Sequence, residues 1–271
     1  MKISVALATY NGEMYILQQL KSIAEQSLLP FELIISDDCS TDSTYSIICN
    51  FAKIAPFNVK ISRNIVNIGY VKNFEKAILQ CSGDYIALAD QDDIWDLDKI
   101  KTLISEIGEN FLIHTDAVLI DSMGKVLHDS YTNYSGKYLG QDFVQYLACN
   151  NVTGCTMMFK KDIIRHVLPF PDDFPFHDWW IALHAVYLKK IKYCDKKLIC
   201  YRQHGLNQVG AKISSEHIGK LDIESKKRQY FNSMTALQII RDLGCFSTYY
   251  DKAIDDFLNY YKRYFIYNFS I

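Results

Sequence analysis

The sequence lacks the features that mark several specialised classes of protein. Charged residues make up 22% of the 271, and the formal net charge of −2 leaves no basic field that would favour nucleic acid as a partner. No apolar run approaches the ~18 residues of a membrane span. The N-terminus, MKISVALATYNGE, has no small-residue cleavage site. We therefore expect it to form a first strand rather than a signal peptide, and we expect a cytoplasmic protein.

Metal-binding cysteine pairs and phosphate-binding glycine loops are missing too. The eight cysteines form no C-x-x-C and lie mostly in apolar segments, which favours buried free thiols over disulfides or zinc. Neither G-x-x-x-x-G-K-[ST] nor G-x-G-x-x-G is present. If a phosphate group binds here, a metal ion has to carry much of its charge.

Hydrophobic residues are abundant, at 49%, and in the first half they alternate between two periods. Apolar, β-branched runs predict strands at 3–9, 32–36, 59–62 and 85–89, and helical spacing predicts helices near 16–24, 45–52, 70–80 and 100–107. This order predicts an α/β fold with a mostly parallel central sheet flanked by helices. After residue 110 we expect a small antiparallel part, with strands at 111–121, 125–128, 155–159 and 198–203, and then a helical segment over 217–271.

Three polar clusters follow the predicted strands: Thr9-Tyr10-Asn11, Asp37-Asp38 and Asp90-Gln91-Asp92-Asp93. Ligands of open α/β sheets bind beyond the carboxyl ends of the strands, so we expect the clusters to share one rim. Three carboxylates in four positions repel one another, and a hard divalent cation offsets that repulsion. A calcium loop of the EF-hand type would need Gly at position 95, where this chain has Trp95. The alternative is a helix start decorated with acids that favour its dipole.

Four linked motifs resemble the family 2 glycosyltransferases, which have the GT-A fold, and above all their rhamnosyltransferase-like bacterial branch. They are VALATYNGEMYILQQLKSIAEQS, ELIISDDCSTDST, NIGYVKNFEKAILQCSGDYIALADQDDIW and FHDWWIAL, and the resemblance covers about residues 1–210. It implies a catalytic domain over 1–215, with a nucleotide-binding half (1–110) and an acceptor half (111–215). Residues 216–271 would then form a C-terminal helical extension.

The resemblance also implies roles on the donor side. The residues expected at the nucleotide are Thr9, Tyr10, Asn11, Glu13, Asp38, Asn67, Gly69, Lys72, Asp90 and Gln91. Asp38 would accept a hydrogen bond from the pyrimidine N3–H, and Lys72 would meet a phosphate. Asp90 and Asp92 match the family's D-x-D and would hold Mn²⁺ or Mg²⁺. His204, on the loop after the last strand, would ligate the metal or contact a phosphate, with a structural role as the alternative.

On the acceptor side, the resemblance implies direct displacement with inversion, and Asp178 as the base that deprotonates the acceptor hydroxyl. This chain has His177-Asp178 where the family usually has Glu-Asp, which leaves any role of the glutamate in doubt. The residues expected near the donor or acceptor sugar are Asp93, Trp95, Gly154, His177, Trp179 and Trp180. Of the two adjacent tryptophans, we expect one in the core and one facing the acceptor.

Together these features predict an inverting, metal-dependent glycosyltransferase. It would move a sugar from a UDP- or dTDP-sugar to a bacterial surface glycan, such as capsule or O-antigen, on a lipid carrier. The alternatives are a nucleotidyltransferase with a related core and a non-catalytic protein that binds sugar nucleotides. Residues 226–271 contain twelve Phe and Tyr and seven Lys and Arg. That composition fits a helix packed on the main domain or a peripheral membrane surface.

Overall fold

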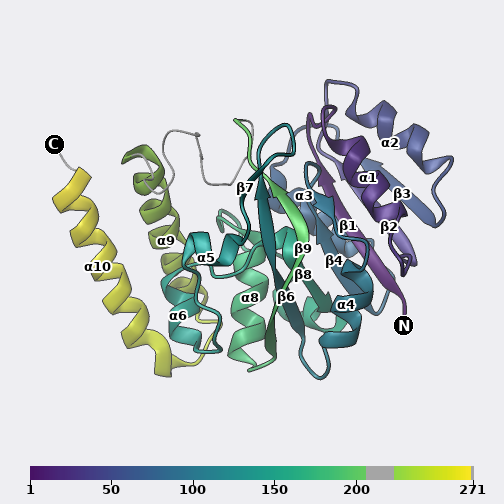
Figure 1. Cartoon of the computed structure of the whole chain (residues 1–271). Coiled ribbons are helices and arrows are strands. Elements are labelled where there is room, and N and C mark those ends of the chain that lie inside the picture. The colour runs from purple at the N-terminus through teal and green to yellow at the C-terminus, as the bar shows by residue number, and fades with distance from the viewer. Residues whose placement is uncertain (206–222, 270–271) are drawn as a thin grey trace.

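One mixed sheet forms the centre of the protein (Figure 1). The computed structural model describes residues 1–205 and 223–269, so the predicted boundary between residues 215 and 216 lies outside the described residues. Within the described part, the strand order is β3-β2-β1-β4-β8-β6-β9-β5, with β7 paired to β6. The predicted α/β class is confirmed.

The first half forms the parallel part of the sheet, as the sequence predicts. Its strands are β1 (Ile3–Thr9), β2 (Glu32–Asp37), β3 (Asn58–Arg63) and β4 (Tyr85–Ala89), and its helices are α1 (Ile16–Ala24), α2 (Thr44–Ala52) and α3 (Tyr70–Leu79). β1 pairs in parallel with both β2 and β4, and β2 pairs in parallel with β3. The carboxyl ends of β1, β2 and β4 therefore meet at one rim.

The second half adds the antiparallel part. It contains β5 (Ile94–Trp95), α4 (Lys99–Glu106), β6 (Leu112–Ile120), β7 (Val126–His128), α5 (Tyr131–Ser135), α6 (Phe143–Ala148), β8 (Met157–Lys160), α7 (Ile164–Val167), α8 (His177–Tyr187) and β9 (Ile191–Arg202). β8 is antiparallel to both β4 and β6. Short 3₁₀ turns lie at Gly154–Thr156, Lys161–Ile163 and Thr248–Tyr250.

Two strands differ from the sequence expectation. β9 begins at Ile191, seven residues before the expected start. The early part of the strand was not predicted because exposed charged residues at 195–197, where the register with β6 shifts, interrupt its apolar pattern. The strand expected at 155–159 starts at Met157, because a 3₁₀ turn occupies the residues before it.

Alternating side chains of the strands face two separate cores. Ala6, Ile34 and Ile86 belong to the core that contains residues of α3, α6 and α8. Val5 and Leu33 belong to the core on the other face, which contains residues of α1, α2 and α4. The period of two along each strand produces this division.

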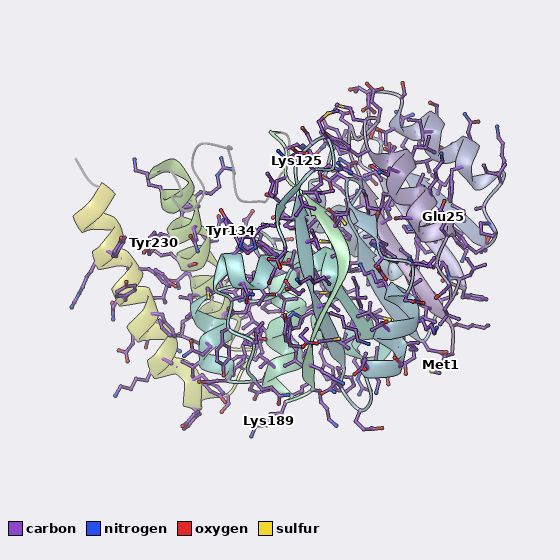
Figure 2. All side chains as sticks on the ribbon, in the orientation of Figure 1. Met1, Glu25, Lys125, Tyr134, Lys189 and Tyr230 are labelled. Carbon is purple, nitrogen blue, oxygen red and sulfur yellow. The ribbon has the colours of Figure 1, made fainter. Side chains whose placement is uncertain are left out.

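The C-terminal part is an antiparallel hairpin of α9 (Ile223–Leu243) and α10 (Asp251–Phe269). Ala236, Leu237 and Ile240 of α9, with Ile254 and Leu258 of α10, join the core around α8. None of the helices in the described residues is long and apolar enough to cross a membrane. Figure 1 shows that α9 begins and α10 ends on the side toward which β1 and β4 run. In Figure 2, Lys125, just before β7, lies on that side, whereas Met1 and Lys189 lie on the opposite side.

Candidate active site

The loop after β1 is fixed by a side chain of the acidic segment. The backbone N–H of Tyr10 donates to Oε1 of Gln91 at 2.9 Å, and Nε2 of Gln91 donates to the Tyr10 carbonyl at 3.0 Å. A Cβ on Gly12 would lie 2.3 Å from Oε1 of Gln91, so glycine at this position leaves room for the Gln91 amide. The first and third predicted clusters are thus in direct contact, and the Gln91 amide fixes the backbone of the loop after β1.

The same loop is bonded to the loop after β2. Asn11, in the left-handed region at φ 46°, accepts a hydrogen bond from the N–H of Thr41 at 2.8 Å. Glu13 accepts one from the N–H of Ser43 at 2.9 Å. Thr9 donates to the buried Asp37 at 3.2 Å. The second cluster therefore lies at the same rim.

Asp38 is buried and held by three donors from one segment. Its Oδ1 accepts from Asn64 Nδ2 at 2.8 Å and from the N–H of Ile68 at 2.9 Å, and its Oδ2 accepts from the N–H of Gly69 at 2.9 Å. Asn67 also accepts from the Gly69 N–H, at 3.1 Å. These bonds fix the orientation of the Asp38 carboxylate.

Lys72 lies on α3, where its ammonium contacts the loop that leads into α8. Its Nζ donates to the Phe170 carbonyl at 2.8 Å and pairs with Asp172 at 3.0 Å and Glu75 at 3.4 Å. These partners raise its pKa against the opposing effect of burial.

The carboxylates after β4 lie in a poorly solvated, negatively charged environment. Burial is the largest effect on Asp90, and with the neighbouring charges of Asp92 and Asp178 it raises the Asp90 pKa to about 7. Burial, followed by Asp92 and Asp90, also raises the pKa of Asp93. Asp178 and Asp90 are therefore near enough for the charge of one to affect the pKa of the other.

Arg202, at the end of β9, supports this acidic segment, and the sequence analysis did not identify it. Its N–H donates to Asp93 Oδ1 at 2.9 Å, and its Nε donates to the Asp92 carbonyl at 2.7 Å. Its guanidinium also donates to Gln18 Oε1 at 2.8 Å and to the carbonyls of Asp121 and Ser122, both at 3.2 Å. Two features could have identified Arg202: its place two residues before His204 and its burial. Only the first can be read from the sequence.

His204 lies two residues later and contacts the predicted metal ligand. Its Nε2 is 2.8 Å from Oδ2 of Asp92, and its ring lies 4.8 Å from that of Tyr15. The structure therefore brings together Asp92 and His204, two of the three residues predicted at the metal.

The closest group of possible metal-binding atoms differs from the predicted set. Among the described residues, ligand atoms of Asp90, Asp93 and Cys155 all lie within 4.8 Å of one another, and neither Asp92 nor His204 belongs to this group. Burial raises the Cys155 pKa well above its usual value, so the thiol stays protonated and suits a hard cation poorly. Oxygen and imidazole donors from Asp90, Asp92 and His204 match Mn²⁺ or Mg²⁺ chemistry better.

Asp178 lies in the first turn of α8 and is held by three donors. Its Oδ1 accepts from Asn150 Nδ2 at 2.9 Å and from the N–H of Trp179 at 2.7 Å, while its Oδ2 accepts from the N–H of Gly154 at 2.9 Å. A Cβ on Gly154 would lie 3.1 Å from Nε2 of His177. Gly154 thus allows its backbone to approach the carboxylate, and Asn150 is a second residue that the sequence analysis missed.

The aromatic residues near this turn are buried. Trp179 is 1% exposed and Trp180 is 4% exposed, so the expectation that one of them faces the acceptor is wrong. Their indole N–H groups donate to the carbonyls of Tyr146 and Val167, at 2.7 and 3.0 Å, inside the core. Residues 179–186 of α8 are all buried, so the spacing of apolar residues could not show which tryptophan faces the core.

His177 and Trp95 are buried as well. The His177 ring stacks on Phe74 at a centroid distance of 4.1 Å, and burial lowers its pKa. Trp95 lies beneath the buried Lys99, whose Nζ is 3.8 Å from the ring centroid and donates to the Cys155 carbonyl at 2.5 Å. Burial lowers the Lys99 pKa to about 8. Both of these predicted sugar-site residues are therefore buried in the packing behind the candidate site.

Tyr70, on α3, was not expected at the site. Its hydroxyl donates to the carbonyl of Pro175, and burial, with the charges of Asp178 and Asp90, raises its pKa well above the usual value. The hydroxyl therefore stays protonated and neutral near the charges of Asp178 and Asp90.

Comparison with known sequences agrees with the motifs. A family model described as Glycosyl transferase family 2 matches residues 4–168. The dTDP-rhamnosyl transferase RfbG of Shigella flexneri is 35% identical over 221 residues, which cover 77% of this chain and 75% of that protein. Poly(ribitol-phosphate) beta-N-acetylglucosaminyltransferase TarS of Staphylococcus aureus is 35% identical over 127 residues, which cover 46% of this chain and 21% of TarS.

Solved structures support the same fold. S. aureus TarS 1–349 in complex with UDP-GlcNAc superposes with a TM-score of 0.65 at 19% identity, covering 99% of this chain and 73% of that chain. Mannosyltransferase PcManGT from Pyrobaculum calidifontis, in complex with GDP-Man and Mn²⁺, gives a TM-score of 0.65 at 13% identity and covers 100% and 76%. These neighbours confirm the predicted GT-A fold.

Proposed function

The chain belongs to glycosyl transferase family 2 and is a nucleotide-sugar glycosyltransferase, and we propose that it inverts the anomeric centre of its donor sugar. We propose a UDP- or dTDP-sugar as donor and a lipid-linked bacterial glycan as acceptor. One observation carries the proposal: hydrogen bonds fix the Asp178 carboxylate in a position from which its charge affects Asp90 of the acidic segment.

Donor binding is assigned to the first 110 residues. Asp38 is fixed by three protein donors and retains acceptor capacity for a pyrimidine N3–H. Tyr10 is partly exposed beside it, on the loop that Gln91 holds. Because RfbG is named a dTDP-rhamnosyl transferase, dTDP-rhamnose is the first donor to test.

A divalent cation fits the donor set of the acidic segment. Asp90 and Asp92, with His204, would hold Mn²⁺ or Mg²⁺, and the ion would supply positive charge for the departing diphosphate. Burial, and after it the negative charges of Asp92 and Asp178, raise the pKa of Asp90, and such an ion would favour its ionised form. Arg202 would keep the Asp92 backbone in place for this role.

Asp178 is the proposed general base, in the acceptor half of residues 111–215. Its Oδ1 already accepts two hydrogen bonds, whereas its Oδ2 accepts one and retains a lone pair for an acceptor hydroxyl. As the acceptor oxygen bonds to C1 of the sugar, its proton passes to Asp178, and the bond from C1 to the diphosphate oxygen breaks. Inversion follows from this single displacement.

Exchange of Asp178 for Asn tests the assignment. We expect Asp178→Asn to lower kcat by roughly 10²–10⁴-fold, the usual contribution of a general base, while the Kd for UDP or dTDP stays the same. Asp173→Asn is the matched control, since Asp173 is exposed on the loop before α8. Turnover by Asp178→Asn at the wild-type rate would exclude Asp178 as the base.

The nucleotide and the metal are tested separately by thermal stabilisation. The protein is heated with UDP, dTDP, GDP or CDP, each with Mn²⁺, Mg²⁺ or EDTA. A ligand that binds the native state raises the midpoint by mass action, so we expect a metal-dependent shift with UDP or dTDP. A shift that EDTA leaves unchanged would refute metal dependence. Absence of catalysis by a protein that still binds nucleotide would favour the non-catalytic alternative.

A further inference from the structure

The two ends of the C-terminal hairpin differ in charge. Residues 223–240 and 257–269 together contain five Lys or Arg and one acid, Glu224, whereas residues 241–256 contain four Asp and two Lys or Arg. The acids of that closed end are partly neutralised by Arg241, which pairs with Asp251 at 3.0 Å and Asp255 at 3.1 Å. Because the helices are antiparallel, the start of α9 and the end of α10 form one cationic open end.

Aromatic side chains connect the two helices at this open end. Tyr230 of α9 stacks on Tyr264 of α10 at a centroid distance of 4.4 Å, and Tyr260 lies 6.0 Å from Tyr264. Figure 2 shows Tyr230 in the half of the hairpin nearer the open end. Phe231 is 59% exposed and Tyr260 is 54% exposed, so large rings face solvent beside the cations.

We call this surface the basic tip, and it consists of Lys227, Arg228, Phe231, Tyr260 and Arg263. The side chains of Arg228 and Arg263 are exposed, and among the described residues neither has a carboxylate partner. Lys262 is not included, because it lines a pocket with Asp172 and Asp173. The basic tip therefore combines positive charge with exposed apolar rings.

The orientation of the hairpin relates the basic tip to the active site. Figure 1 shows that the open end lies on the side of the molecule to which β1 and β4 run, and the closed end lies toward the opposite side. A flat surface in contact with the basic tip would therefore lie on the same side as Asp90 and the other rim residues.

We propose that the basic tip binds the surface of an anionic lipid bilayer and so presents the catalytic rim to it. Aromatic rings insert at the headgroup level of a bilayer, and Lys and Arg contact its anionic phosphates. An anionic glycan would also pair with the arginines and could stack on the rings, and the dextran sulfate measurement below distinguishes it from a bilayer. The inference extends the proposed lipid-linked acceptor, but the binding itself requires neither donor nor catalysis.

The test is sedimentation of the full chain with vesicles. We expect binding to vesicles that contain phosphatidylglycerol, weaker binding to pure phosphatidylcholine, and loss of binding at 1 M salt, where charges are screened within ~3 Å. Each basic residue near an anionic surface contributes roughly a fivefold factor, so Arg228→Glu with Arg263→Glu should lower the partition coefficient at least about 25-fold. Phe231→Ser with Tyr260→Ser should weaken binding to both kinds of vesicle.

Matched controls change the same properties elsewhere. Lys252→Glu with Lys189→Glu repeats the charge reversal away from the basic tip, and Tyr249→Ser removes a ring that is 82% exposed at the closed end. Both controls should bind as the wild type does. Equal binding by the tip variants and the controls would overturn the proposal, as would a wild type that ignores anionic vesicles.

Two further measurements separate this proposal from others. Binding of the wild type to dextran sulfate but not to vesicles would identify a glycan surface and overturn the membrane assignment. Donor hydrolysis in solution should be the same in the tip variants and the wild type. If hydrolysis is absent from every variant and the wild type but vesicle binding behaves as expected, the proposed catalytic function fails while the membrane inference stands.

Discussion

Replacement of Arg202 by Lys should loosen the acidic segment while it preserves the charge. The guanidinium donates to oxygen atoms of three separate segments and lies over the Tyr15 ring at 4.7 Å. An ammonium group has one nitrogen and cannot reach all of these acceptors, so at least two hydrogen bonds should be lost. Hydrogen bonds to a charged group contribute about 1.5–3 kcal/mol each. Water replaces some of them at the rim, and we expect a net loss of roughly 2–4 kcal/mol.

Two assays follow from this magnitude. The loss corresponds to a fall in Tm of roughly 5–15 °C for a domain of this size. Mutation of residues that orient metal ligands typically weakens metal affinity about 10–100-fold. We therefore expect the Mn²⁺ concentration for half-maximal donor hydrolysis to rise by such a factor in Arg202→Lys. The Arg241→Lys control, an exposed ion pair, should change stability by about 0–1 kcal/mol and leave the metal response intact.

An unchanged Tm would show that the hydrogen bonds of Arg202 contribute little. A lower Tm with an unchanged Mn²⁺ requirement would show that Arg202 supports the fold without positioning Asp92. Either result would refute the coupling between β9 and the acidic segment.

Three further predictions concern other contacts. Gly12→Ala should lower nucleotide affinity as Gln91→Ala does, because the new Cβ would displace the Gln91 amide; the double variant should bind, by calorimetry, no worse than Gln91→Ala alone. Asn150→Ala removes one of three hydrogen bonds to Asp178, so kcat should fall about tenfold while the nucleotide Kd stays constant; an equal change in both would contradict a role limited to the base. Burial lowers the His114 pKa to about 3, so this ring favours the unfolded state as pH falls below about 6.5. His114→Phe should therefore reduce the loss of stability between pH 7 and 4.5 by roughly 3 kcal/mol, and a pH profile of Tm identical to that of the wild type would count against this cause.

The sequence was most informative about strands that have a clear apolar pattern and are followed by polar residues at the rim of the sheet. β1, β2 and β4 were predictable because each is an apolar run that is almost fully buried. β3, at the edge of the sheet, has no buried residue, and the alternation of its apolar and polar residues identified it instead. β5 was not predictable, since two residues carry no period. The start of β9 was hidden by the exposed charges of Asp195, Lys196 and Lys197.

Motifs located the candidate site but did not identify the residues that support it. Arg202 and Asn150 act through hydrogen bonds to residues 109 and 28 positions away in the chain, and no local pattern encodes such contacts. For the same reason, the sequence could not show that both polar atoms of the Gln91 side chain form hydrogen bonds with the backbone of Tyr10. Trp180 packs against Phe246 of the C-terminal hairpin, and Trp179 packs against Phe174 and Phe176; the helical pattern of α8 describes neither contact.

The shared core of α8 and the hairpin bears on how this chain could be shortened or recombined. Asp178 lies in the first turn of α8, and the ring centroid of Trp180 in the same helix lies 6.2 Å from that of Phe246, between α9 and α10. A shortened chain that ends before α9 would expose the outer face of α8 to water, and the Asp178 carboxylate, the proposed base, would lose the packing behind it. Exchange of acceptor specificity between related enzymes should therefore transfer α8 together with α9 and α10, and it should keep the side chains of β1, β2 and β4 that pack against the same core, such as Ala6, Ile34 and Ile86.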